Sequence, residues 1–97
     1  MLTVVETVAF SEWMSGLGDA RGRARILARV ERMRLTGHLG DAASVGGGVS
    51  ELRIHFGPVY RVYFCRRSAE VVILLRGGDK GSQARDIRAA KALAKEV

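Results

Sequence analysis

The sequence has one cysteine, one proline and no long apolar run among its 97 residues. Cys65 has no partner for an internal disulfide, and we interpret it as a small apolar strand residue rather than a catalytic thiol. No segment approaches the roughly 20 apolar residues of a membrane span. The N-terminus also lacks a basic region followed by an apolar stretch. We therefore expect a cytoplasmic protein that does not enter a membrane.

Motifs for metals and organic cofactors are missing as well. One cysteine and two histidines, which lie far apart in the sequence, are too few soft ligands for a metal site. The glycine spacings of phosphate loops and dinucleotide sites do not occur, and neither does the G-x-S-x-G pattern of hydrolases. We therefore expect a protein that needs neither a metal nor a cofactor.

Acidic residues are few: 10 Asp and Glu stand against 16 Lys and Arg, which gives a net charge of +6. Thirteen of the 16 basic residues are arginine, whose planar side chain suits phosphate and carboxylate groups. This balance favours a polyanionic partner, either nucleic acid or an acidic protein, over a basic surface that serves only solubility. At 47% hydrophobic residues, the chain is expected to form a single domain over residues 1–97.

The stretch from Glu51 to Lys80 predicts three antiparallel strands, because apolar and polar residues alternate along its first two segments. The apolar face of this hairpin is expected to hold Leu52, Ile54, Phe56, Tyr60, Val62 and Phe64. The opposite face is expected to hold Glu51, Arg53, His55, Arg61, Tyr63 and Cys65. We take this second face, with its two arginines, as an exposed candidate site. Two carboxylates near it, those of Glu51 and Asp79, are interpreted as salt-bridge partners, with a role as proton acceptor as the alternative. The third strand, residues 71–75, is continuously apolar and should be covered on both faces.

The rest of the chain predicts a strand at residues 2–8, a helix capped by Thr7 and a second helix from Asp19 to about Leu35. Residues 37–48 are rich in glycine and are interpreted as a long mobile loop. A last helix should run from Ser82 to Glu96, with Ser82 as its cap. The predicted fold is α+β, in the order β-α-α-β-β-β-α, with a twisted, mainly antiparallel sheet packed against a helical hairpin.

Two further segments are candidates for contact with an anion. The second helix carries six arginines, and we take Arg25 and Arg29 as nucleic-acid contacts, with a solvated basic face as the alternative. The turn from Gly77 to Ser82 offers backbone N–H groups and Lys80 at the start of a helix, which can hold one phosphate group. An ordinary glycine turn is the alternative there. Arg76, next to this turn, is a third candidate contact.

The segments VSELRIHFGPVYRVYF and LLRGGDKGSQARDI, together with the order of the elements, resemble the RelE/ParE toxin superfamily. Within it, the chain is similar to the short HigB-like addiction module killer proteins of phage-derived loci. The resemblance implies a toxin of a bacterial type II toxin–antitoxin system, silenced by a helix-turn-helix antitoxin. RelE-like members cleave mRNA on the ribosome without a metal, whereas ParE-like members poison DNA gyrase.

Carried over by position, Arg61 matches the arginine of the Y-R-V-Y strand that contacts the scissile phosphate. Arg53 stands where ribonuclease members place a basic residue, and Lys80 or Arg85 falls near the basic position after the last strand. The final helix has no tyrosine or histidine to protonate the leaving oxygen.

The chemistry of RNA cleavage leads to the same face. A metal-independent ribonuclease must activate the 2′-hydroxyl, stabilise extra negative charge on the phosphate and protonate the leaving 5′-oxygen. Arg53 and Arg61 suit the second task, and His55 suits either proton transfer. Tyr63 is expected either to stack on a base or donate a hydrogen bond to the RNA, or to support the sheet. The preferred prediction is an mRNA endoribonuclease; a gyrase inhibitor and a non-catalytic nucleic-acid-binding module are the alternatives.

Overall fold

The computed structural model describes all residues from 1 to 97. Its helices and strands follow one another as β1 (Thr3–Glu6), α1 (Val8–Gly16), α2 (Ala20–Thr36), β2 (Ala42–Gly46), β3 (Val49–Ile54), β4 (Tyr60–Arg66), β5 (Val71–Gly78), the short 3-10 helix η1 (Lys80–Ser82) and α3 (Gln83–Ala94). The predicted α+β class is confirmed.

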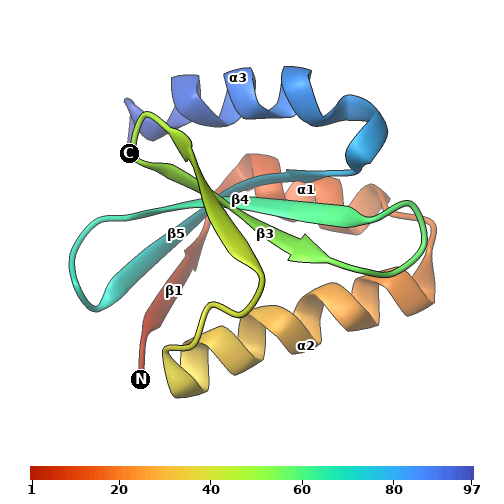
Figure 1. Cartoon of the computed structure of the whole chain (residues 1–97), viewed down its shortest axis with the longest axis horizontal. Helices are drawn as coiled ribbons and strands as arrows, with labels where there is room; N and C mark the ends of the chain where they lie inside the picture. The colour runs from red at the N-terminus through yellow and green to blue at the C-terminus, as the bar shows by residue number, and fades with distance from the viewer.

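The five strands form one twisted sheet in the order β1-β5-β4-β3-β2, as Figure 1 shows. The pairs β2–β3, β3–β4 and β4–β5 are antiparallel, and only the pair β1–β5 is parallel. The sheet is therefore mainly antiparallel, as the sequence predicted.

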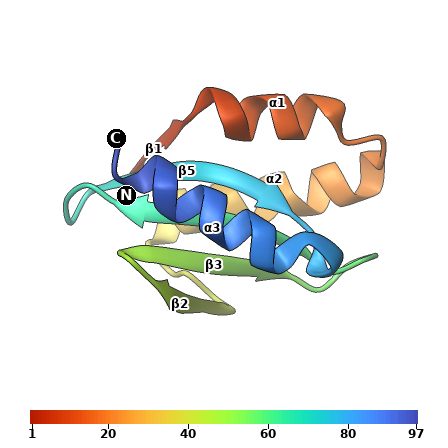
Figure 2. The same ribbon diagram turned by 90° about the horizontal axis from the view of Figure 1, so that it is seen from above.

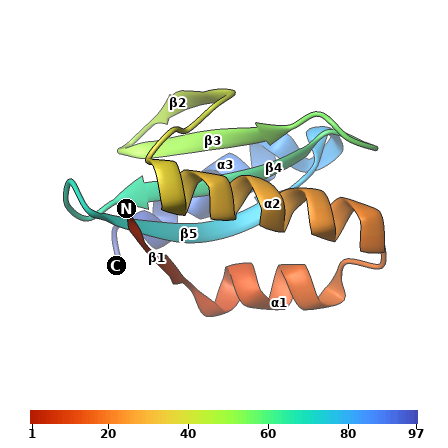
Figure 3. The ribbon, with the colours of Figure 1, turned by 90° about the horizontal axis from the view of Figure 1, so that it is seen from below.

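Helices cover both faces of this sheet. Helices α1 and α2 lie side by side as a hairpin on one face (Figure 3), while α3 crosses the other face (Figure 2). Phe10 and Met14 of α1 and Ile26 and Met33 of α2 are buried in the larger of two apolar clusters. Ala90 of α3 belongs to the smaller cluster. None of the three helices has both the length and the apolar character needed to cross a membrane.

The alternation along the strands is confirmed. Leu52 and Ile54 of β3 and Tyr60, Val62 and Phe64 of β4 all point into the larger cluster, beneath α1 and α2. Strand β5 is buried on both sides: Val72 and Leu74 belong to the larger cluster, and Ile73 and Leu75 to the smaller one. This double burial explains its unbroken apolar run.

The predicted helix caps are confirmed for α1 and α2. The Thr7 hydroxyl accepts from the Phe10 N–H at 3.2 Å, and the Asp19 carboxylate accepts from the Gly22 N–H at 2.9 Å. Helix α2 ends at Thr36, and Gly37 follows in the left-handed conformation with φ 75°, which costs glycine little.

The prediction of a loop over residues 37–48 is wrong in part. Strand β2 occupies Ala42–Gly46 and pairs with β3 as the edge of the sheet. Its sequence, AASVG, has too few large apolar side chains to indicate a strand. Gly46, Gly47 and Gly48 all have positive φ, so the glycines form a tight turn between β2 and β3.

Candidate functional site: an arginine pair around a buried carboxylate

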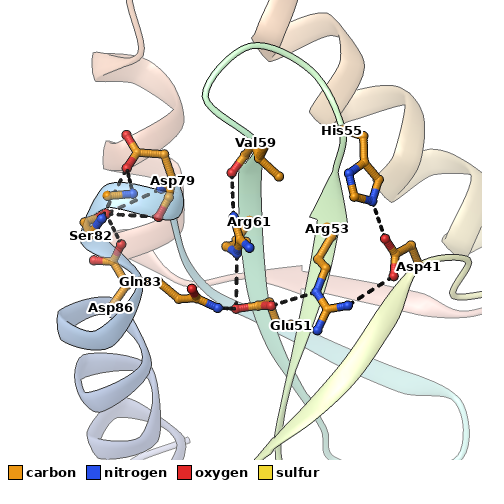
Figure 4. Close-up of polar contacts among 11 residues, drawn as sticks. Asp41, Glu51, Arg53, His55, Val59, Arg61, Asp79, Ser82, Gln83 and Asp86 are labelled. Carbon is orange, nitrogen blue, oxygen red and sulfur yellow. Dashed lines mark hydrogen bonds and ion pairs between the residues drawn. The ribbon is translucent and has the colours of Figure 1, made fainter.

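The register of β3 and β4 brings the two predicted arginines together. Arg53 pairs directly with Arg61 across the two strands. The Nε atom of Arg53 lies 3.0 Å from Glu51 Oε1, and the Nε atom of Arg61 lies 3.4 Å from Glu51 Oε2. Figure 4 shows Glu51 between the two guanidinium groups. One carboxylate thus forms ion pairs with both arginines. This confirms the interpretation of Glu51 as a salt-bridge partner.

Glu51 is completely buried, with an exposed fraction of 0%. Burial alone would raise the pKa of its carboxyl group, but hydrogen bonds from Arg53 and Gln83 and the charge of Arg61 outweigh that effect and lower the pKa below its ordinary value. The Gln83 side chain, at the start of α3, donates to Glu51 Oε2 at 2.9 Å. Glu51 is therefore an ionised anchor for groups from β3, β4 and α3.

His55 lies at the end of the same row and pairs with Asp41, a residue that the sequence did not single out. His55 Nε2 and Asp41 Oδ2 are in hydrogen-bond contact, and Arg53 Nη1 lies 3.4 Å from Asp41 Oδ1 (Figure 4). The hydrogen bond with His55, aided by the charge of Arg53, lowers the pKa of Asp41. This carboxylate fixes the orientation of an imidazole whose side chain is 66% exposed.

Arg61 is buried, which corrects the expectation that it is exposed. Only 7% of the residue is accessible, because α3 covers this face of β4 (Figure 2). Its Nη1 donates to the Val59 carbonyl at 2.9 Å. Of the two arginines, Arg53 has the accessible side chain, at 37% exposed against 9%. A ligand on this surface therefore meets Arg53 first.

The model of one known family matches most of the chain. Residues 12–96 match the model of the family described as "Phage derived protein Gp49-like (DUF891)". The chain belongs to the Gp49-like family. It is also 44% identical over 96 residues to an uncharacterized protein of Haemophilus influenzae strain KW20 Rd, an alignment that covers 99% of this chain and 96% of the relative.

In this Gp49-like protein, Tyr63 is wholly buried, with 0% of the residue exposed. The expectation that it stacks on a base is therefore wrong, and the alternative of a supporting role in the sheet holds. Tyr63 packs with Val49, Ile73, Leu75 and Ala90 beneath α3. Burial, with the nearby charge of Glu51, raises the pKa of its phenol, so the side chain stays neutral.

The glycine turn of the Gp49-like chain does not offer free N–H groups to a phosphate. The Asp79 carboxylate accepts from the N–H groups of Gly81 and Ser82, at 2.8 and 3.2 Å. Asp79 therefore fills the position that we expected an anion to take, and the alternative of an ordinary turn is correct. Ser82 does stand at the N-cap position of α3, but its hydroxyl bonds to Asp86 and makes no capping hydrogen bond. Lys80 remains exposed at the surface of η1.

Asp86 organises the remaining basic residues near the turn. Its buried carboxylate lies 3.1 Å from Nη2 of Arg76 and 3.9 Å from Nε of Arg85. The Arg76 side chain is 31% exposed, and that of Arg85 is 74% exposed. Arg76 is thus mainly a partner for Asp86, whereas Arg85 extends into solvent on the first turn of α3.

Arg25 and Arg29 lie on α2, on the opposite face of the sheet from α3, and line one pocket together with His55. The Arg29 guanidinium donates to the carbonyls of Arg53 and Leu39, at 2.8 and 2.9 Å. The Arg25 guanidinium stacks over the Phe56 ring at 4.9 Å. No group of three or more His, Cys, Asp or Glu side chains comes together in a way that could hold a metal ion.

Proposed function

We propose that this chain is the toxin of a bacterial type II toxin–antitoxin system and that it cleaves mRNA as a metal-independent endoribonuclease that blocks translation. One observation carries the proposal: the cross-strand arginines Arg53 and Arg61 surround Glu51, and an Asp41-bound histidine lies at the end of their row. Membership of a phage-derived family and the resemblance to RelE/ParE toxins support the biological setting.

The arginines suit the phosphate. Attack by the 2′-hydroxyl gives a pentacovalent phosphorus with one more negative charge, which a positioned guanidinium stabilises. In the proposed mechanism the exposed Arg53 makes the direct contact. Arg61, buried beside Glu51, adds positive charge and keeps Glu51 in place. Glu51 in turn holds the Arg53 side chain, so less conformational entropy is lost when the phosphate binds.

The histidine suits the proton transfers. His55 Nε2 faces Asp41, which leaves Nδ1 as the ring nitrogen available to a substrate. In the proposed mechanism this atom takes the proton of the 2′-hydroxyl or delivers one to the leaving 5′-oxygen. Asp41 stabilises the imidazolium that forms when the ring takes a proton. Lys80 and Arg85, exposed near the start of α3, extend the basic surface for the RNA backbone.

The proposed partner that silences the toxin is a helix-turn-helix antitoxin. The chain has a net charge of +6, so an acidic or amphipathic segment of the antitoxin would cover charge and apolar surface together. Co-expression should give a complex whose association rate falls as salt is added.

The test is to induce the protein in bacterial cells and map mRNA ends. We expect growth arrest, new internal 5′ ends in mRNA and no DNA-damage response. Arg53→Ala should stay folded and lose on the order of a hundredfold in cleavage rate, as expected for the loss of one charged group at the phosphate. Arg66→Ala, at an exposed arginine far along β4, is the matched control.

Two results would decide against the ribonuclease. DNA damage with intact mRNA would identify a gyrase inhibitor, and binding of nucleic acid without any growth arrest would identify a non-catalytic module. A folded Arg53→Ala variant as toxic as the parent would remove the proposed role of the arginine pair.

A further inference from the structure

A groove of about 330 Å³ runs between helix α2 and the end of strand β3. We call it the α2–β3 groove. One wall is formed by α2, and the other is formed by the last residue of β3 and the two that follow it. Its lining residues are Arg25, Ala28, Arg29, Arg32, Ile54, His55 and Phe56. Its size is that of a site for a small ligand.

The groove is strongly basic. Three of its seven lining residues are arginines and none is acidic. None of these three arginines makes an ion pair with a carboxylate. Arg29 is held in place by two backbone carbonyls, while Arg25 and Arg32 are exposed. Arginines that are not directly paired with a carboxylate favour an anionic ligand.

The groove also has a flat surface. The Arg25 guanidinium lies over the Phe56 ring, 4.9 Å from its centroid, and Phe56 itself packs against the core. Guanidinium and aromatic planes are the surfaces on which unpaired nucleic-acid bases stack. An acidic peptide would use the charges of the groove but would gain nothing specific from this flat surface.

His55 connects the groove with the arginine pair. It lines the groove and is also the partner of Asp41. Strand β2 begins at Ala42, opposite Leu52, so it does not cover the edge of β3 at residues 54–56. The segment before β2 pairs with β3 only as far as Arg53, whose N–H donates to the Asp41 carbonyl at 2.9 Å. Beyond this point, the route from Arg53 to the groove leads past the exposed His55.

We propose that the α2–β3 groove binds the nucleotide of single-stranded mRNA that adjoins the scissile phosphate. The phosphate of this nucleotide lies against Arg29 and Arg32, and its base stacks on the Arg25–Phe56 pair. The inference rests on the proposed ribonuclease function and assigns its substrate a second contact, on the α2 face of the sheet.

The test compares two double variants that lose the same charge. Arg25→Ala/Arg32→Ala changes the groove, and Arg66→Ala/Arg67→Ala changes two exposed arginines at the turn between β4 and β5. Arg29 is left intact because it supports the backbone of β3. Cleavage of a defined mRNA is measured in a reconstituted translation mixture. We expect the groove variant to raise KM about tenfold with kcat within about twofold, because its residues contact RNA away from the reacting atoms. The control should change KM by less than about threefold.

A second measurement isolates the base. A fluorescent RNA with a 2′-deoxy sugar at the cleavage position cannot react, so its anisotropy reports binding alone. Phe56→Leu keeps an apolar side chain against the core but removes the flat ring. We expect it to weaken binding on the order of tenfold. Most of that loss should vanish with a probe that lacks the base next to the cleavage position.

The outcomes separate the inference from the function on which it rests. If the wild-type protein cleaves mRNA and the two double variants behave alike, the groove is not a substrate site, although the ribonuclease stands. If the groove variant loses only its association with ribosomes and binds the free probe normally, the groove contacts ribosomal RNA and the inference is overturned. If the wild-type protein neither cuts mRNA nor binds the probe, the proposed function fails, and the inference fails with it.

Discussion

Arg53 and Arg61 face each other across β3 and β4, and each has its Nε atom within 3.4 Å of the same buried carboxylate, that of Glu51. Two like charges in adjacent strands would normally repel. Glu51 makes the pairing favourable, so the arrangement of the cationic site depends on one acidic residue.

Replacing Glu51 with glutamine keeps the shape of the side chain and removes its charge. We expect a loss of about 3 kcal/mol in the free energy of unfolding, because the buried Arg61 is left without its counter-ion. Urea denaturation measures the loss, and Glu70→Gln, at an exposed residue, should have almost no effect. A Glu51→Gln variant as stable as the parent would contradict the anchor role.

Glu51 should also make the stability of the protein depend on pH. The folded pKa of Glu51 lies below the ordinary value of 4.5, so its contribution to stability is complete above that pH and is lost as the pH falls through the folded pKa. Urea midpoints measured from about pH 6 to about pH 3 should fall more steeply for the parent than for Glu51→Gln. Parallel curves would show that Glu51 does not titrate in this way.

Asp41→Asn should impair cleavage without affecting folding. Asp41 is exposed, but it orients His55, and asparagine cannot stabilise an imidazolium as a carboxylate does. We expect about a tenfold or greater loss in kcat, measured with a defined mRNA. Glu12→Gln, at an exposed position on α1, is the control. Equal rates for Asp41→Asn and the parent would exclude the His55–Asp41 pair from catalysis.

The two glycines at the end of β5 should resist substitution for different reasons. A Cβ atom on Gly77 would collide with the Trp13 ring, and one on Gly78 would collide with the Asp86 carboxylate. Each change to alanine should lower the stability by about 2 kcal/mol, or about 10 °C in Tm for a domain of this size. Gly18→Ala, where nothing lies within 4 Å, should leave Tm unchanged or slightly higher. Similar Tm values for all three variants would show that Trp13 and Asp86 can move aside to make room for the added methyl groups.

The hydrogen bond between Tyr60 and Asp19 should make the stability of the protein depend on pH in alkaline solution. Its hydroxyl donates to Asp19 Oδ2 at 2.7 Å, and this bond raises the pKa of Tyr60 from 10.0 to about 12. The stabilisation is therefore complete below pH 10 and is lost as the pH rises toward 12. Tyr60→Phe should cost about 1 kcal/mol at about pH 8. That difference from the parent should shrink at about pH 11, and a constant difference would refute the assigned cause.

The sequence predicted which way side chains point more reliably than what covers them. Alternation placed Arg53 and His55 on one face and Ile54 on the other, because the period of a strand is fixed by its backbone. It could not show that α3 packs over Arg61 and Tyr63, since that contact depends on side chains more than 20 positions away. An arginine or a tyrosine on a strand looks the same in sequence whether it is exposed or held by a buried partner.

Asp41 and Asp79 escaped prediction for a related reason. Asp41 precedes a strand of small residues that gave no strand signal, so nothing in the sequence brought it beside His55. Asp79 was interpreted as a salt-bridge partner, whereas its side chain closes the turn by accepting from the N–H groups of Gly81 and Ser82. Short polar side chains often bind the local backbone in this way, and that use competes with any ligand for the same N–H groups.

The parallel pairing of β1 with β5 has a consequence for the order of synthesis. Thr3 pairs with Val71 and Glu6 with Leu74, so the first strand leaves the ribosome long before its neighbour in the sheet exists. Contacts so distant in sequence form late in folding. The nascent chain therefore reaches its folded form only when translation is nearly complete. A truncated mRNA gives fragments that lack the pairing of β1 with β5 and also lack helix α3. A cell in which protein synthesis falters would make little of the finished protein.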